Sequence, residues 1–326
     1  MNPLSRWVLP LLLAALLSSA AFASSTDNNT STWLDRMNTA LRTLNYAGDI
    51  VYIHDNNIET MRVTHRADSE GGIERLISLT GPQREVIRNH NEVKSIFPES
   101  HSVLIERRYA ATHFPGSIPQ AVHEDKLLAH YIFKSSGADR IAGHVCKVID
   151  IEPRDDYRYG YRLWLDTSNA MLLRSDLITN DGKTVERVMF TSINYPRQIP
   201  DEALKATEIK PGYIWNIQGG RELLNKADTK LDWKATHLPP GFILSMNDAQ
   251  RLVGAMNPVR HLMFSDGLAS VSVFVEAAMP GRKELIGPSS MGAVSAFGRQ
   301  VGNYNITVVG EVPPETVELI ARNIRN

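Results

Sequence analysis

Apolar and polar positions alternate through the stretch from Tyr157 to Asn194. Its first segment places tyrosines and leucines on one side and Arg158, Arg162 and Asp166 on the other. This period of two predicts a half-buried strand. Turn residues at 167–169 and 180–182 separate it from two further alternating segments, and Asp-Gly between two such segments is typical of a hairpin. The stretch is therefore predicted to form three consecutive antiparallel strands with one apolar face.

The preceding half of the chain has the same rhythm. Apolar residues from Trp33 to Leu44 recur at helical spacing, and short polar turns then separate alternating segments up to Arg108. A helix followed by a meander of strands favours an antiparallel sheet over a parallel α/β one. Residues 113–137 interrupt the alternation and predict a helical segment, either a lid over the apolar sheet face or part of the core, and the pattern slightly favours the core. The next strand is predicted over Arg140–Glu152.

A second domain is predicted after a proline-rich segment of mixed charge at 196–212. Beyond it, residues 261–278 alternate around an Asp-Gly turn, 281–298 are predicted to form a loop, and 298–313 a further hairpin. Pro313-Pro314 is predicted to begin a helix. We predict a large β domain over 24–200, a linker over 201–216 and a small α+β domain over 217–326.

The first residues predict export. Arg6, an apolar run to Leu17 and the sequence Ala21-Phe22-Ala23 form a secretory signal peptide over 1–23. The apolar run is shorter than the roughly 20 residues that a membrane span requires. Cys146 is the only cysteine, so no intramolecular disulfide can form, and we interpret it as a small buried hydrophobic residue rather than a reactive thiol.

Composition and motifs narrow the function. Lys and Arg number 35 against 36 Asp and Glu, which gives no reason to expect a nucleic-acid partner. No metal-ligand spacing, cofactor-binding glycine motif or nucleophile motif is present, so no catalytic, metal or cofactor residue is predicted. An enzyme would need a Ser–His–carboxylate cluster assembled from distant positions. The apolar face of the sheet is then either a filled core, which this pattern favours, or a cavity for an acyl chain or apolar peptide.

Three stretches carry a resemblance to a known family. Residues 140–178 (RIAGHVCKVIDIEPRDDYRYGYRLWLDTSNAMLLRSDLI), 261–281 (HLMFSDGLASVSVFVEAAMPG) and 296–321 (AFGRQVGNYNITVVGEVPPETVELIA) resemble the RseB/MucB family, periplasmic negative regulators of the envelope-stress sigma factor E. The resemblance implies a large domain similar to lipoprotein carriers, an unclosed antiparallel β-barrel over helices. It also implies a linked, smaller C-terminal antiparallel sheet with a helix, and no enzymatic activity.

The same resemblance implies partners. Members of the family bind the periplasmic part of a transmembrane anti-sigma factor and protect it from proteolysis, and lipopolysaccharide or a related lipid releases it. On this basis the acyl chains are expected on the apolar face, at Tyr159, Tyr161, Leu163, Leu165, Met171 and Leu173. The anti-sigma factor is expected at Phe264, Ser265, Asp266, Gly267 and Leu268, together with the groove between the domains. The alternative is a periplasmic lipoprotein or acyl-chain carrier; self-association and the identity of the lipid stay open.

The arginines of the opposite face, Arg158, Arg162 and Arg174, have two interpretations. They either meet anionic head groups or lie on a solvated surface, and the second is favoured.

Overall fold

The computed structural model describes residues 28–70, 72–107, 127–218, 233–250, 259–279, 281 and 284–326. The predicted signal peptide and residues 113–126 of the predicted lid-or-core segment lie outside these ranges. Within the described residues, no helix is both long and apolar enough to cross a membrane.

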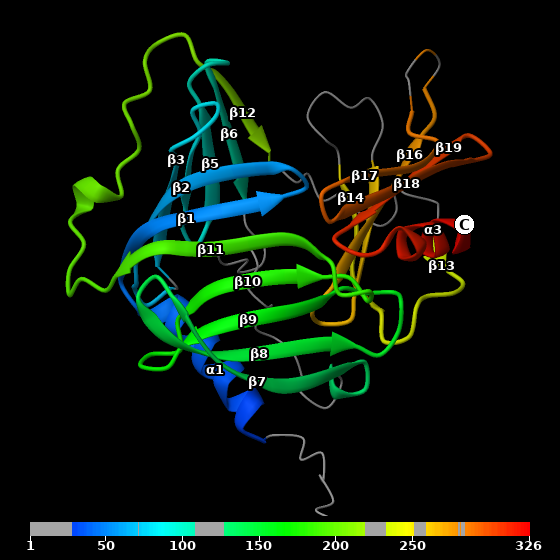
Figure 1. Cartoon of the computed structure of the whole chain (residues 1–326). Helices are drawn as coiled ribbons and strands as arrows, with labels where there is room; N and C mark the ends of the chain where they lie inside the picture. The colour runs from blue at the N-terminus through cyan, green and yellow to red at the C-terminus, as the bar shows by residue number, and fades with distance from the viewer. Residues whose placement is uncertain are drawn as a thin grey trace, which may run out of the picture.

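A twelve-stranded sheet forms the larger part of the molecule (Figure 1). It follows the helix α1 (Asn28–Thr43). Its strands in chain order are β1 (Tyr46–His54), β2 (Asn57–Arg66), β3 (Ile73–Ser78), β4 (Glu85–Arg88), β5 (Glu92–Phe97), β6 (Ser102–Arg107), β7 (Tyr131–Ile141), β8 (His144–Pro153), β9 (Gly160–Asp166), β10 (Leu172–Ile178), β11 (Thr184–Asn194) and β12 (Ile214–Gln218). The order across the sheet is β12-β6-β5-β4-β3-β2-β1-β11-β10-β9-β8-β7. Because β12 and β7 are not paired with each other, the sheet curves without closing, as predicted.

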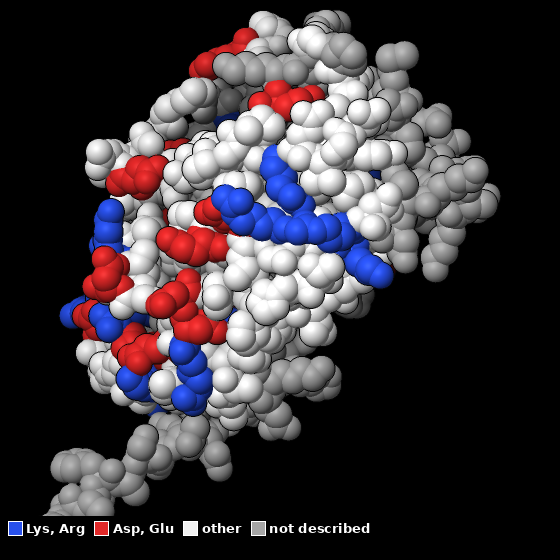
Figure 2. Space-filling view, turned by 90° about the vertical axis from the view of Figure 1, so that its right-hand side faces the viewer, with Lys and Arg blue, Asp and Glu red and all other residues white. Residues whose placement is uncertain are grey.

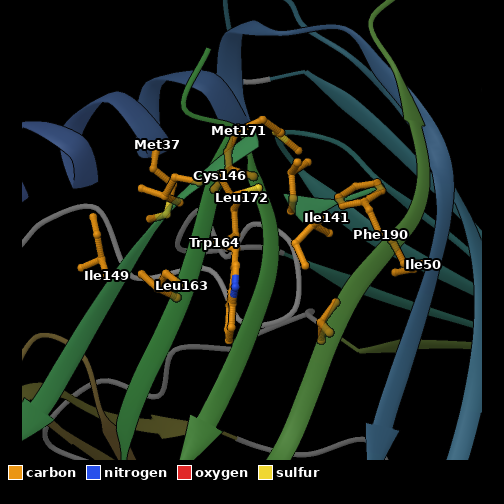
Figure 3. Close-up of a cluster of buried hydrophobic side chains, with 14 of the residues drawn as sticks. Met37, Ile50, Ile141, Cys146, Ile149, Leu163, Trp164, Met171, Leu172 and Phe190 are labelled. Carbon is orange, nitrogen blue, oxygen red and sulfur yellow. The ribbon is translucent and has the colours of Figure 1, made fainter. Parts of the chain in front are cut away.

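The concave side of this sheet holds the main hydrophobic core. Apolar residues at alternate positions, such as Ile50, Leu163 and Phe190, are 0–1% exposed. Met37 and Leu41 of α1 belong to the same cluster, and Figure 3 shows Met37 beside residues from β8, β9 and β10. Helix α1 is therefore buried along one face, which is what stabilises a helix of this length in water.

Ion pairs within strands and between neighbouring strands line the outer side. Arg162 bonds Asp150 at 2.5 Å, and Arg174 and Arg187 both bond Asp176. Burial tends to raise the pKa of Asp176, but the hydrogen bonds from the two arginines lower it below its usual value. On the side of the molecule that carries the small domain, Figure 2 also shows acidic and basic side chains intermixed. Arg162 and Arg174 are thus neutralised by carboxylates of their own sheet.

The second domain is a six-stranded antiparallel sheet covered by a helix. Its strands are β14 (Ile243–Gln250), β15 (Val259–Ser265), β16 (Ser270–Ala277), β17 (Gly287–Met291), β18 (Val294–Val301) and β19 (Tyr304–Gly310), in the order β14-β15-β16-β19-β18-β17. Helix α3 (Pro314–Asn323) buries Val317, Ile320 and Ala321 against it. A short pair, β13 (Lys234–Ala235) with β20 (Ile324–Arg325), adds Trp233 to this core. The hairpin around Asp266-Gly267 and the C-terminal helix confirm the predicted pattern.

The segment between the domains is fixed to the outside of the large sheet. It contains a short 3-10 helix, Asp201–Ala203. Arg66 bonds Asp201, and the amide of Thr207 donates to Glu85. Strand β12 then pairs with β6 in parallel, an exception to the otherwise antiparallel order. The division into domains at 201–216 stays a prediction.

Three predicted segments differ from the structure. Tyr131 and Ile132, expected in a helix, begin strand β7, because pairing with β8 on both sides of an irregularity at 136–137 outweighs the local helical spacing. Residues 287–291 and 294–298, expected in a loop, belong to the β17–β18 hairpin. Strand β9 begins at Gly160 rather than Tyr157, because the amide of Tyr157 donates to the Asp155 side chain and turns the chain there.

Candidate functional site

The small domain rests on one end of the large sheet, where β8, β9, β10 and β11 begin or end (Figure 1). The tip of the β15–β16 hairpin, residues 265–269, reaches into the large domain. It is called the hairpin tip below. Its side chains make buried contacts with the large domain, and these contacts define the candidate site.

Arg158 is the centre of this contact. It lies in the turn before β9 and is completely buried, with 0% of its surface exposed. Asp155 of the same turn accepts from Nε and Nη2 at 2.9 and 3.0 Å. From the small domain, Asp266 accepts from Nη1 at 2.5 Å and the Pro240 carbonyl accepts from Nη2 at 2.6 Å. The solvated surface favoured for Arg158 is wrong, because the second domain covers it.

The two carboxylate oxygens of Asp266 have different partners, and one of them is directed at this guanidinium. Its Oδ1 accepts from the amides of Leu268 and Ala269, which closes the turn of the hairpin tip. Its Oδ2 accepts from both Arg158 and the Tyr131 hydroxyl, at 2.9 Å for the latter. Burial, and then the negative charge of Asp266, raises the pKa of Tyr131 above its usual value, so the hydroxyl stays protonated. The carboxylate thus receives two donors from the large domain.

Leu268 extends the contact into the apolar interior. It is 6% exposed and belongs to the hydrophobic cluster of the large domain, although it comes from the small one. Together with Tyr161 and Val188 it lines a cavity of about 190 Å³ between the domains. The hairpin tip therefore places one carboxylate and one branched apolar side chain into the large domain.

A second contact brings two carboxyl groups together. Glu311, which follows β19, faces Glu186 of β11 at the same cavity and shares a hydrogen bond with it. Two carboxyl groups can share such a bond only when one of them is protonated. Solvent reaches Glu311, but protein atoms around its carboxyl and then the charge of Glu186 raise the pKa of Glu311 to about 7. Tyr52 of β1 also bonds Glu186.

Further polar contacts complete the interface. The Thr316 hydroxyl of α3 donates to the Tyr157 carbonyl at 2.8 Å. In the turn between β17 and β18, the amide of Gly292 donates to Asp55 and that of Ala293 to Glu186. The domains are therefore joined by directed hydrogen bonds as well as apolar contacts.

The residues predicted to bind acyl chains divide into two groups. Leu163, Leu165, Met171 and Leu173 are 0–1% exposed in the cluster beneath α1, where Figure 3 shows Leu163 and Met171. Tyr159 instead packs with Ala293 of the small domain, and Tyr161 contacts both groups. In this arrangement the face is filled by helix α1, by neighbouring strands and by the hairpin tip.

The residues predicted to bind the anti-sigma factor lie close together on the second domain. Phe264 is buried in that domain's own core, and Asp266 and Leu268 are occupied by the large domain. Ser265 and Gly267 remain half-buried. Sequence reasoning missed Tyr131 and the buried role of Arg158. The available signal was the pair Asp155-Asp156 just before Arg158, which predicts a turn that brings a carboxylate close to the guanidinium.

Other groups of polar side chains in the part of the chain that the structure describes do not form a second candidate site. Within the described residues, no group of three or more His, Cys, Asp or Glu side chains is arranged to hold a metal ion. His261 Nε2 lies 3.0 Å from the Ser272 hydroxyl, but the imidazole ring stacks on Phe274 within the small sheet. Cys146 is buried, and burial raises the pKa of its thiol to about 11, which agrees with the predicted inert residue.

Comparison with known proteins covers both domains. Family models described as the MucB/RseB N-terminal domain and the MucB/RseB C-terminal domain match residues 29–208 and 227–325. The chain is 30% identical over 323 residues to the Sigma-E factor regulatory protein RseB of Escherichia coli K12, covering 98% of this chain and 97% of the relative. It is 31% identical over 322 residues to the Sigma factor AlgU regulatory protein MucB of Pseudomonas aeruginosa, covering 97% and 96%.

A solved structure has a similar fold. The MucA/MucB complex of Pseudomonas aeruginosa contains a chain with a TM-score of 0.69 and 28% identity, covering 91% of this chain and 98% of that one. These relatives are regulatory proteins of sigma factors by name. Because matches to both family models together span most of the sequence, the chain belongs to the MucB/RseB family.

Proposed function

We propose that this protein is a periplasmic negative regulator of an envelope-stress sigma factor. It binds the periplasmic domain of a transmembrane anti-sigma factor, protects it from regulated proteolysis and releases it when a lipid such as lipopolysaccharide binds. The observation that supports this most strongly is the match to MucB/RseB proteins along nearly the whole chain, together with the structural likeness to MucB from a complex with MucA. Export through the signal peptide over 1–23 is part of the same proposal.

The interface between the domains suggests how binding and release are coupled. In the arrangement described, the hairpin tip is docked in the large domain, and its Ser265 and Gly267 are half-buried. We propose that the anti-sigma segment binds this docked arrangement along the groove and the hairpin, and that lipid binds the arrangement in which the hairpin tip has left. Two ligands that prefer different arrangements weaken each other's binding by the same factor.

The test is binding of the purified mature protein to the periplasmic segment of the anti-sigma factor from the same organism, with and without lipopolysaccharide. We expect saturable binding that lipopolysaccharide weakens, and faster proteolysis of the bound segment once lipid is added. Binding that is unchanged by lipid would contradict lipid-controlled release. No binding at all would contradict the proposed regulation of the anti-sigma factor.

A periplasmic lipoprotein or acyl-chain carrier is the outcome to be distinguished. Pull-down from an envelope extract separates the two, because a carrier recovers lipoprotein cargo and no anti-sigma factor.

A further inference from the structure

Arg158 and Tyr131 form a pair of donors that belongs to the large domain. Asp155 holds Nε and Nη2 of Arg158 from the same turn, so the guanidinium is oriented by its own domain. This leaves Nη1 directed at the small domain, where it and the Tyr131 hydroxyl donate to the same oxygen of Asp266. Two converging donors, one of them charged, are a binding arrangement for an anion.

The apolar interior begins directly behind this pair. Leu268 follows Asp266 by two residues and occupies a place in the large domain's cluster, next to Tyr161 and Val188. The hairpin tip thus presents a negative charge at the end of the sheet and a hydrocarbon side chain inside it. An acyl chain with an anionic head group has the same two features in the same order.

We propose that Arg158 and Tyr131 form the head-group site for an anionic amphiphile, a carboxylate or phosphate attached to a hydrocarbon chain, and that the hairpin tip occupies this site as an internal competitor. The head group takes the place of the Asp266 carboxylate, and the chain follows the path that Leu268 vacates. The inference rests on the proposed function and specifies the lipid site within it.

Burial of Arg158 explains why the ligand is anionic. A guanidinium that is withdrawn from water is strongly destabilised when its counter-charge is lost. A neutral amphiphile in the place of the hairpin tip would remove Asp266 and the Pro240 carbonyl from Arg158 and return no charge, so Asp155 alone would balance the covered guanidinium. An anionic one restores the pairing, so the exchange of hairpin for lipid keeps the buried charge satisfied.

Three probes test the site on the full mature protein by isothermal titration calorimetry. They are dodecyl phosphate, dodecanol as its uncharged counterpart, and inorganic phosphate as the head group without a chain. We expect dodecyl phosphate to bind at least tenfold more tightly than dodecanol, and inorganic phosphate to show no measurable binding. Equal affinity for dodecyl phosphate and dodecanol would contradict a site for an anionic head group. Equal affinity for dodecyl phosphate and inorganic phosphate would contradict the requirement for a hydrocarbon chain.

Variants separate the competitor from the site. Asp266→Asn keeps the shape of the hairpin tip but weakens its hold on Arg158, so we expect dodecyl phosphate to bind about tenfold more tightly. The matched control is Asp201→Asn, an exposed aspartate paired with Arg66, which should leave the affinity unchanged. Arg158→Gln should abolish the preference for dodecyl phosphate over dodecanol, and if this variant does not fold, the Asp266→Asn result still decides.

An unchanged affinity in Asp266→Asn contradicts the internal competitor. The proposed function fails separately, when the wild-type protein does not bind the anti-sigma segment, and that result leaves the three titrations intact.

Discussion

Two parts of the domain interface are built on opposite electrostatics. Arg158 meets Asp266, a positive and a negative charge that attract each other at every pH at which the aspartate is ionised. Glu311 meets Glu186, two groups that repel each other unless they hold a proton between them. We expect the first contact to contribute most to the free energy of docking, and the second to make docking depend on pH. Each prediction below disturbs one of the two or a contact beside them.

The largest effect is expected from Asp266→Ala. It removes one of the two carboxylates that pair with a fully buried guanidinium, and losing one partner of a buried pair costs about 3–5 kcal/mol. Urea unfolding followed by tryptophan fluorescence measures the change, and small-angle scattering should show a larger radius of gyration. A radius equal to that of the wild type, with less than 1 kcal/mol lost, would contradict the role of the pair.

Leu268→Ala should weaken docking by about 2–3 kcal/mol, because it removes a buried leucine from the cluster and leaves a cavity. The same urea experiment measures it. The control is Leu79→Ala, a leucine that is 45% exposed on the large domain, which should change stability by less than about 0.5 kcal/mol. Similar losses in both variants would mean that Leu268 is not part of the large domain's core.

Thr316→Val should cost about 1 kcal/mol, the usual net value of one hydrogen bond, because the Tyr157 carbonyl loses its donor. The side chain keeps nearly the same volume, so packing is preserved. Exchange of the amide hydrogens at the hairpin tip should become faster by roughly the corresponding factor of five. If exchange at the tip is unchanged, α3 does not contribute to docking.

The smallest effect is expected from Glu311→Gln, and it depends on pH. The pKa of Glu311 is raised from 4.5 to about 7, so the docked form binds the proton more tightly than the open form. Docking is therefore fully favoured below about pH 4.5 and loses this contribution as the pH rises through 7. Glu186 and Arg187 of β11, Tyr52 of β1 and Tyr161 of β9 face this carboxyl.

Scattering and urea unfolding between pH 5 and pH 8 measure this dependence. Glu311→Gln should flatten it and stabilise docking at pH 8, whereas Glu202→Gln, an exposed glutamate outside the interface, should behave as the wild type. A wild-type interface that strengthens with rising pH over this range has the wrong sign and would rule the proton-sharing pair out.

Local patterns predicted most of the secondary structure. The alternation around Asp266-Gly267 and the Pro313-Pro314 start of α3 were sufficient, because they depend on neighbours in sequence. The β7 strand was missed because Leu127, Leu128, Tyr131 and Ile132 have helical spacing, and its true partner, β8, outweighs that spacing only in the assembled sheet.

The candidate site was predicted only in part. The apolar face and the hairpin were identified separately, but nothing local indicates that they meet. Arg158 and Asp266 are 108 residues apart, and Arg158 has the same place in the alternation as Arg162, which is a paired surface residue. Burial by a second domain is a property of the tertiary structure and leaves no trace in the period of a strand.

The pairing of β12 with β6 limits how far the second domain can travel. Gln218 ends a strand of the large sheet, and Trp233 is already part of the small domain's core, so fourteen residues separate two fixed points. Fully extended, they span at most about 50 Å. Because the two domains belong to one chain, redocking of the hairpin tip is an intramolecular step whose effective concentration depends on this separation. Any ligand that displaces the hairpin tip must compete with that concentration, so inserting residues between Gln218 and Trp233 should lower the amount of lipid needed for release.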